Sequence, residues 1–102
     1  MPTINLNRKK KTFTKNDDNK LNARVYNTVI WKNLRLNYLM ENPLCELCLK
    51  ENRIKSACEV HHIKEISNGK TLEEKQNICY NANNLMSLCL FHHHSIHNNK
   101  NL

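Results

Sequence analysis

The chain has 102 residues, which is the size of one ordinary domain. Its composition is 39% apolar and 6% aromatic, so its core is small, and a bound metal commonly supplements such a core. No apolar run approaches the roughly 20 residues that span a bilayer, which excludes a membrane-spanning protein. No apolar stretch follows Met1, so we expect a cytoplasmic protein whose thiols stay reduced.

The net charge of +7 predicts a polyanionic partner, with nucleic acid as the first candidate. Residues 1–24 carry seven Lys or Arg against two Asp, so this stretch holds +5 of the net charge. Residues 1–22 are also rich in Asn and Lys and lack apolar periodicity. We therefore expect residues 1–23 to form a flexible basic arm, and residues 24–102 to form one domain. The arm either contacts phosphates or is an idle solvated tail.

A helical pattern covers residues 25–41. Apolar side chains recur there every four positions, at Tyr26, Ile30, Leu34 and Tyr38. Asn27 or Thr28 can cap the start of this helix, and Asn42 ends it because a residue before proline disfavours the helical conformation. Trp31 is expected to lie in the core.

Two short segments are typical of β-strands. Residues 59–63 alternate between apolar and polar side chains, and residues 85–89 are mostly apolar. The stretch between them is mostly polar, with a possible helical turn at 71–75, and residues 91–98 predict a terminal helix. The sequence therefore predicts a small α+β domain.

Two pairs of residues have the spacing of a tetrahedral zinc site. Cys45 and Cys48 form one pair, and Cys89 is followed three residues later by His92. A two-residue gap lets both side chains of a pair bind one ion, and three cysteines with one histidine are an accepted structural zinc set. His94 is an alternative fourth ligand. The competing interpretation is that the cysteines are small buried apolar residues.

The histidines predict a second metal site. His61 and His62 are adjacent in an expected strand and so point to opposite faces, whereas His93 and His97 are four apart on one helical face. We expect a site built from His61, His93 and His97 beside an unligated His62. Phosphodiester hydrolysis needs such parts, namely a metal that neutralises phosphate charge and a base that titrates near neutral pH. The competing interpretation is a solvated histidine-rich end that binds metal opportunistically.

The order of these motifs resembles the HNH endonuclease family, and more narrowly the small zinc-knuckle HNH nucleases of phages and mobile elements. The motifs that carry the resemblance are Cys45-x2-Cys48, Val60-His61-His62-Ile63, Asn84-Leu85 and Cys89-x2-His92-His93. A helix with a tryptophan also precedes an Asn-Pro-Leu-Cys turn in those nucleases. The resemblance covers about residues 24–98. It implies a ββα-metal (His-Me finger) core over residues 58–98, with a zinc knuckle at 45–48 and 89–92 and a preceding helix.

The resemblance also assigns roles to individual residues. It makes His62 the general base and His61 a ligand of the catalytic metal. Asn84 matches the N of the family name, which fixes the loop that holds the base. His93 matches the final H, a metal ligand, and His97 matches a further metal histidine of the bacteriocin nucleases. The fourth knuckle position is usually Cys and is His92 here, a change that zinc can tolerate.

The implied function is a metal-dependent DNA endonuclease, encoded by a phage or mobile element and acting in a bacterial host cell. It implies one structural Zn²⁺ and one catalytic divalent ion, either Mg²⁺ or, given the histidine ligands, Mn²⁺, Ni²⁺ or Zn²⁺. The products would carry 5′-phosphate and 3′-hydroxyl ends. The alternative is a non-catalytic zinc module that binds nucleic acid. A secreted disulfide protein is disfavoured by the odd number of cysteines, five.

Binding to double-stranded DNA is expected to be mainly electrostatic and salt-dependent, with little sequence readout. The expected phosphate contacts are Lys9, Lys10 and Lys11 in the arm, and Arg53, Lys55 and Lys64 in the domain. Specificity is then expected to come from a partner such as a phage terminase, from a dimer, or from the structure of the DNA.

Overall fold

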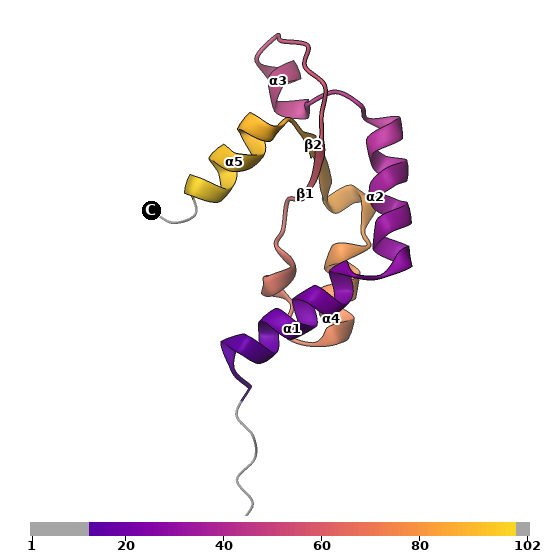
Figure 1. The fold of residues 1–102 in the computed structure, drawn as a ribbon, viewed down its shortest axis with the longest axis vertical. Coiled ribbons are helices and arrows are strands. Elements are labelled where there is room, and N and C mark those ends of the chain that lie inside the picture. Colours follow the sequence, from indigo (N-terminus) through magenta and orange to yellow (C-terminus); the bar gives the residue numbers. More distant parts are fainter. Residues whose placement is uncertain (1–12, 100–102) are drawn as a thin grey trace, which may run out of the picture.

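A two-stranded antiparallel sheet lies at the centre of the structure, a computed structural model that describes residues 13–99. Strand β1 (Glu59–His62) pairs with β2 (Leu85–Leu88), and helices α2 and α5 flank this hairpin (Figure 1). The helices are α1 (Lys15–Tyr26), α2 (Val29–Glu41), α3 (Glu46–Lys50), α4 (Leu72–Cys79) and α5 (Leu90–Asn99), with 3-10 turns η1 (Ile66–Asn68) and η2 (Ala82–Asn84). The predicted α+β class is confirmed. No helix in the described range is long and apolar enough to cross a membrane.

The hairpin separates the two adjacent histidines of β1. The ring of His61 faces His93 and His97 of α5, whereas the ring of His62 lies against Trp31 of α2. This is the expected alternation of strand side chains. Both strands and the terminal helix end within one residue of their predicted limits.

Residues 15–23, which the sequence assigned to a flexible arm over 1–23, instead form most of α1. Thr14 caps this helix, because its side chain accepts a hydrogen bond from the backbone N–H of Asp17, whose carboxylate accepts from the N–H of Thr14. Asp17 and Asp18 also place negative charge in the first turn, where the helix dipole favours it. The rest of the predicted arm, with Lys9, Lys10 and Lys11, lies outside the described residues except for residues 13 and 14.

The single helix predicted over residues 25–41 is two helices in the structure. The first ends at Tyr26, and Thr28 then caps the second, with an extended backbone and a side chain that accepts from the N–H of Trp31. The four-residue stripe is therefore split: Leu34 and Tyr38 pack against the core, whereas Ile30 is 61% exposed. Trp31 is only 6% exposed, which confirms its predicted place in the core.

A buried ion pair fastens α1 to α4. The side chain of Lys75 is completely buried, and its Nζ donates to Oδ1 of Asp18 at 2.6 Å and to Oδ1 of Asn22 at 2.7 Å. A buried ammonium group requires such partners, because its desolvation is otherwise uncompensated. These polar contacts therefore fasten α1 in addition to the burial of Val25.

Replacing Asp18 with asparagine is expected to destabilise the domain near neutral pH by several degrees of melting temperature. The hydrogen bond that Lys75 donates to the Asp18 carboxyl lowers the pKa of this carboxyl below its ordinary value. A lowered folded-state pKa means that this contribution is complete above the unfolded-state pKa and is lost as pH falls through the folded-state value. Thermal unfolding at several pH values should therefore show the wild type losing its advantage over Asp18→Asn only in acid. Glu73→Gln, an exposed carboxylate on α4, is the control, and equal stability of wild type and Asp18→Asn at neutral pH would contradict the prediction.

The buried side chains form two clusters. The larger one joins α1, α2, α4 and the sheet through Val25, Trp31, Val60, Ile66, Cys79 and Leu85. The smaller one consists of Cys45, Cys48, Leu88 and Cys89. Because three of its four residues are cysteines, the second cluster buries little hydrocarbon and needs another source of stability.

Candidate metal centres and active site

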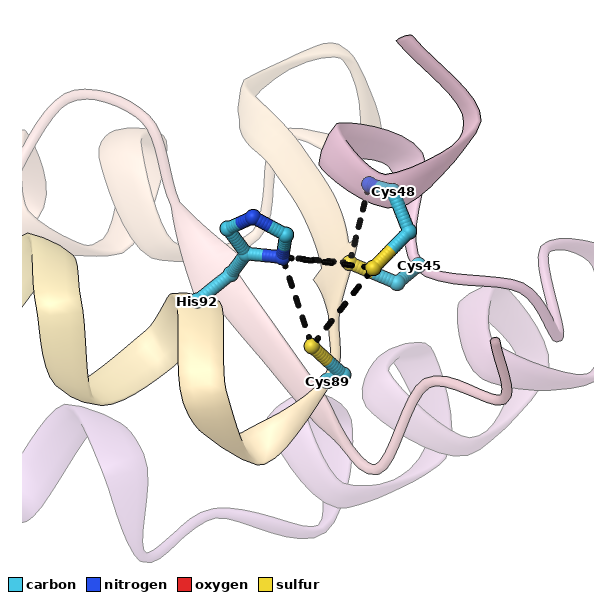
Figure 2. A group of neighbouring side chains, drawn as sticks. All are labelled: Cys45, Cys48, Cys89 and His92. Atoms are coloured by element: carbon cyan, nitrogen blue, oxygen red, sulfur yellow. Dashed lines mark hydrogen bonds between the residues drawn. The ribbon is translucent and has the colours of Figure 1, made fainter. Parts of the chain in front are cut away.

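Four side chains converge between α3, the end of β2 and the start of α5 (Figure 2). His92 directs Nδ1 at the sulfurs of Cys45, Cys48 and Cys89, at 3.4, 3.4 and 3.3 Å, and the sulfurs of Cys48 and Cys89 lie 3.8 Å apart. Tetrahedral zinc with Zn–S bonds of about 2.3 Å places two sulfurs about 3.8 Å apart. The residues therefore fit a structural zinc ion in both chemistry and spacing.

The knuckle favours the thiolate, the form in which cysteine binds metal, at Cys45 but not at Cys48. Burial acts to raise the pKa of the Cys45 thiol, but backbone N–H groups of Cys89 and Cys48, together with the neighbouring thiols, lower it to about 6. Burial and the adjacent sulfurs of Cys45 and Cys89 raise the pKa of Cys48 to about 11. This pattern is typical of thiols too close to ionise together, and a divalent cation removes the conflict.

The fourth knuckle residue is held by a second contact. Nε2 of His92 lies 3.1 Å from Oε1 of Glu51, and Glu51 is itself bound by Arg53 at 2.7 Å. A carboxylate on the far nitrogen fixes the orientation of a metal-binding imidazole. His92 is buried, whereas His94 is exposed and belongs to neither metal-capable group among residues 13–99. The geometry thus favours His92 over His94.

A second group of histidines lies where α5 meets β1. The side chains of His61, His93 and His97 can each offer one ligand atom, all within 4.8 Å of one another, and the Nε2 atoms of His93 and His97 lie 3.0 Å apart. Two nitrogens bound to one metal at about 2.1 Å are about 3.0 Å apart if they meet at a right angle. These residues fit a divalent ion, and the two histidines of α5 meet because they are four apart in a helix.

His62 faces away from this group and is only 5% exposed. Its ring is tilted over Trp31 at a centroid distance of 4.5 Å, and its Nε2 lies 3.1 Å from the carbonyl oxygen of Cys79. A carbonyl only accepts, so Nε2 carries the hydrogen and Nδ1 keeps its lone pair. Burial lowers the pKa of His62, with the hydrogen bond to Cys79 opposing the shift, so the imidazole is neutral at neutral pH.

Asn84 ties the turn before β2 to the loop after β1. Its Oδ1 accepts from the backbone N–H of Lys64 at 2.7 Å, and its Nδ2 donates to the carbonyls of Lys64 and Ile78 at 3.0 and 3.1 Å. Its own carbonyl accepts from the N–H of Ile63 at 2.8 Å. The side chain therefore fixes the backbone that directly follows His62.

A cavity of about 260 Å³ connects these groups. It is lined by His62 and the histidine group His61, His93 and His97, and α1 closes its other side with Asn22 and Tyr26. A lone-pair nitrogen and a metal-capable cluster on one water-accessible cavity can together activate water and bind an anion.

No family model and no curated protein matches the chain. Among solved structures, it is similar to the HNH endonuclease of the deep-sea thermophilic bacteriophage GVE2, crystallised with manganese. The two share 28% identity with a TM-score of 0.64, over 86% of this chain and 94% of the phage protein. The chain has the HNH endonuclease fold. The resemblance expected from the sequence is confirmed, and it supports a nuclease function.

Three candidate phosphate contacts of the domain are exposed, namely Arg53, Lys55 and Lys64. Arg53 donates to both carboxylate oxygens of Glu51, at 3.0 and 2.7 Å, so part of its charge is already balanced. Lys64 is the second residue after β1 and, of the three, lies nearest in sequence to His61 and His62. A role in binding phosphates remains a proposal for all of them.

The sequence patterns did not predict two groups that contact His62, namely the backbone carbonyl of Cys79 and the side chain of Tyr26. The carbonyl of Cys79 is a backbone atom, so no residue type announces it. Tyr26 was assigned to a helical stripe, whereas it ends α1 and lines the cavity. Tyr26 and His62 are 36 residues apart, so no rule of local spacing could have suggested this contact.

Proposed function

We propose that this chain is a metal-dependent endonuclease that hydrolyses phosphodiester bonds in double-stranded DNA, with His62 as the general base. One observation carries the proposal: a neutral, buried His62 and the group His61, His93 and His97 line one cavity. The phage endonuclease with the same fold was crystallised with manganese, which supports a divalent ion here.

The residues around the cavity and in the knuckle have different roles in this mechanism. His62 takes a proton from water through Nδ1, while the Cys79 carbonyl holds Nε2–H and Asn84 holds the following loop. A divalent ion held by the histidine group would supply charge neutralisation at the phosphate and at the leaving 3′-oxygen. Cys45, Cys48, Cys89 and His92 would hold a structural Zn²⁺ that keeps α5 against the hairpin. We expect products with 5′-phosphate and 3′-hydroxyl ends, and an origin in a phage or mobile element.

Cleavage of supercoiled plasmid tests the proposal. Purified protein is incubated with Mg²⁺, Mn²⁺, Ni²⁺, Zn²⁺ or EDTA, and gel electrophoresis separates nicked from linear product. Cutting should require a divalent ion and should disappear in His93→Ala, whose zinc content should be retained. His94→Ala, an exposed histidine on the same helix, is the matched control and should cut normally. A folded wild type that cleaves no plasmid with any of these metal ions would instead favour a zinc module that only binds nucleic acid.

Deleting residues 1–12 is expected to weaken DNA binding and flatten its salt dependence. These residues include Arg8, Lys9, Lys10 and Lys11, and each phosphate contact contributes about 0.9 to the slope of log affinity against log salt. The deletion stops before Thr14, so that the cap of α1 is kept. Fluorescence anisotropy with a short duplex at several salt concentrations measures the slope. An unchanged affinity at low salt would show that the arm is idle.

A further inference from the structure

The last residue of α1 reaches the proposed base. The hydroxyl oxygen of Tyr26 lies 3.5 Å from Nδ1 of His62, the nitrogen that carries the lone pair. The ring of Tyr26 meets the rings of His62 and Trp31 edge-on, at centroid distances of 5.6 and 6.0 Å. Tyr26 also lines the cavity that holds the histidine group. Its hydroxyl therefore lies beside the atom that would accept a proton from water.

The position of Tyr26 is fixed by its neighbour Val25. Val25 is 1% exposed, and its backbone carbonyl accepts hydrogen bonds from the hydroxyls of Thr28 at 2.9 Å and Tyr80 at 3.1 Å. The contacts of Lys75 with Asp18 and Asn22 secure the same helix two turns earlier and one turn earlier. The end of α1 is therefore anchored on several sides and is not a frayed terminus.

The hydroxyl can act both as a donor and as an acceptor. Burial raises the pKa of Tyr26, so the phenol stays protonated at neutral pH. The distance of 3.5 Å to Nδ1 is longer than the 2.7–3.2 Å of a good hydrogen bond, so the direct contact is weak. A water that bonds to both groups from the cavity would satisfy each of them better.

We propose that Tyr26 is a positioning residue, whose hydroxyl holds the attacking water against Nδ1 of His62. In the step it serves, the water oxygen forms a bond to phosphorus while one water proton passes to Nδ1. The bond from phosphorus to the 3′-oxygen breaks, its electron pair leaves on that oxygen, and solvent supplies the proton that completes the hydroxyl. This inference rests on the proposed nuclease function.

The test compares Tyr26→Phe with wild type in steady-state cleavage of a short duplex. Without the hydroxyl, kcat should fall about tenfold, which is part of the roughly 10²–10⁴-fold that a positioned base supplies. KM should be unchanged, and so should Mn²⁺ affinity measured by calorimetry, because neither the DNA-binding surface nor the histidine group is altered. Tyr38→Phe is the matched control, since its hydroxyl bonds Glu46 and the Leu85 carbonyl instead. That variant should keep the wild-type kcat at temperatures where it is folded.

The outcomes separate this inference from the proposed function. A Tyr26→Phe enzyme with wild-type kcat would overturn the role of Tyr26 and leave the nuclease intact. A fall in kcat shared by Tyr38→Phe, or accompanied by lost Mn²⁺ affinity, would also overturn it, since the effect would then be structural. A wild type that cuts no DNA would overturn both proposals together.

Discussion

Replacing His62 with alanine is expected to lower the rate of DNA cleavage by about 10²–10⁴-fold, which is the usual contribution of a general base. The lone pair on Nδ1 is lost, so water at the cavity loses the nitrogen that we propose as the acceptor of its proton. The measurement is single-turnover cleavage of a defined duplex, with zinc and Mn²⁺ binding measured in parallel. Both metal-binding activities should survive, because His62 belongs to neither metal-capable group.

A second substitution distinguishes loss of the general base from loss of folding. His62 is buried against Trp31 and Tyr26, so alanine leaves a void that destabilises the core. His62→Gln keeps most of the volume, and its amide can still donate to the Cys79 carbonyl, but it offers no basic nitrogen. Both variants should be inactive at temperatures where they are folded. A folded His62→Gln protein that cuts at the wild-type rate would exclude His62 as the base.

Removing zinc, or replacing Cys89 with serine, is expected to unfold the domain. The cluster of Cys45, Cys48, Leu88 and Cys89 buries little hydrocarbon. The free energy of zinc binding is therefore expected to supply the free energy of folding in this part of the domain. Structural zinc contributes roughly 10–16 kcal/mol in small zinc-binding peptides, which is as large as the roughly 5–15 kcal/mol total stability of a domain. Circular dichroism during titration with a chelator should show cooperative loss of structure that added zinc reverses.

Cys58→Ser is the matched control for this prediction. Cys58 is exposed and lies outside the knuckle, so its replacement should leave zinc content and stability unchanged. If Cys89→Ser, stripped of zinc, kept the wild-type melting temperature, the knuckle would not be structural. Cleavage activity is not needed for this test, so it stands apart from the question of function.

The metal-capable groups were predictable because their ligands are set by local spacing. A two-residue gap brings Cys45 and Cys48 together, and a four-residue gap in a helix aligns His93 with His97. The opposite directions of His61 and His62 followed from the alternation of a strand. Each of these rules operates within a few residues, so a single sequence is enough to apply it.

The placement of α1 was not predictable by such rules. The helix is held by an ion pair between Asp18 and Lys75, which are 57 residues apart, and a lysine in a polar stretch is normally exposed. Thr28 was one of the two predicted caps and is confirmed, but the helix was predicted to begin before it, since apolar residues continue with helical spacing on both sides. Tyr26 was therefore assigned to the second helix although it ends the first, and its contact with His62 emerged only from the structure.

The histidine in the knuckle changes the electrostatics of that end of the domain. Zinc with four thiolates carries a net charge of −2, whereas zinc with three thiolates and a neutral imidazole carries −1. Glu51 returns one negative charge beside His92, and Arg53 balances it. With zinc bound, a DNA phosphate that approaches the start of α5 would therefore meet one negative charge fewer than at a knuckle of four cysteines.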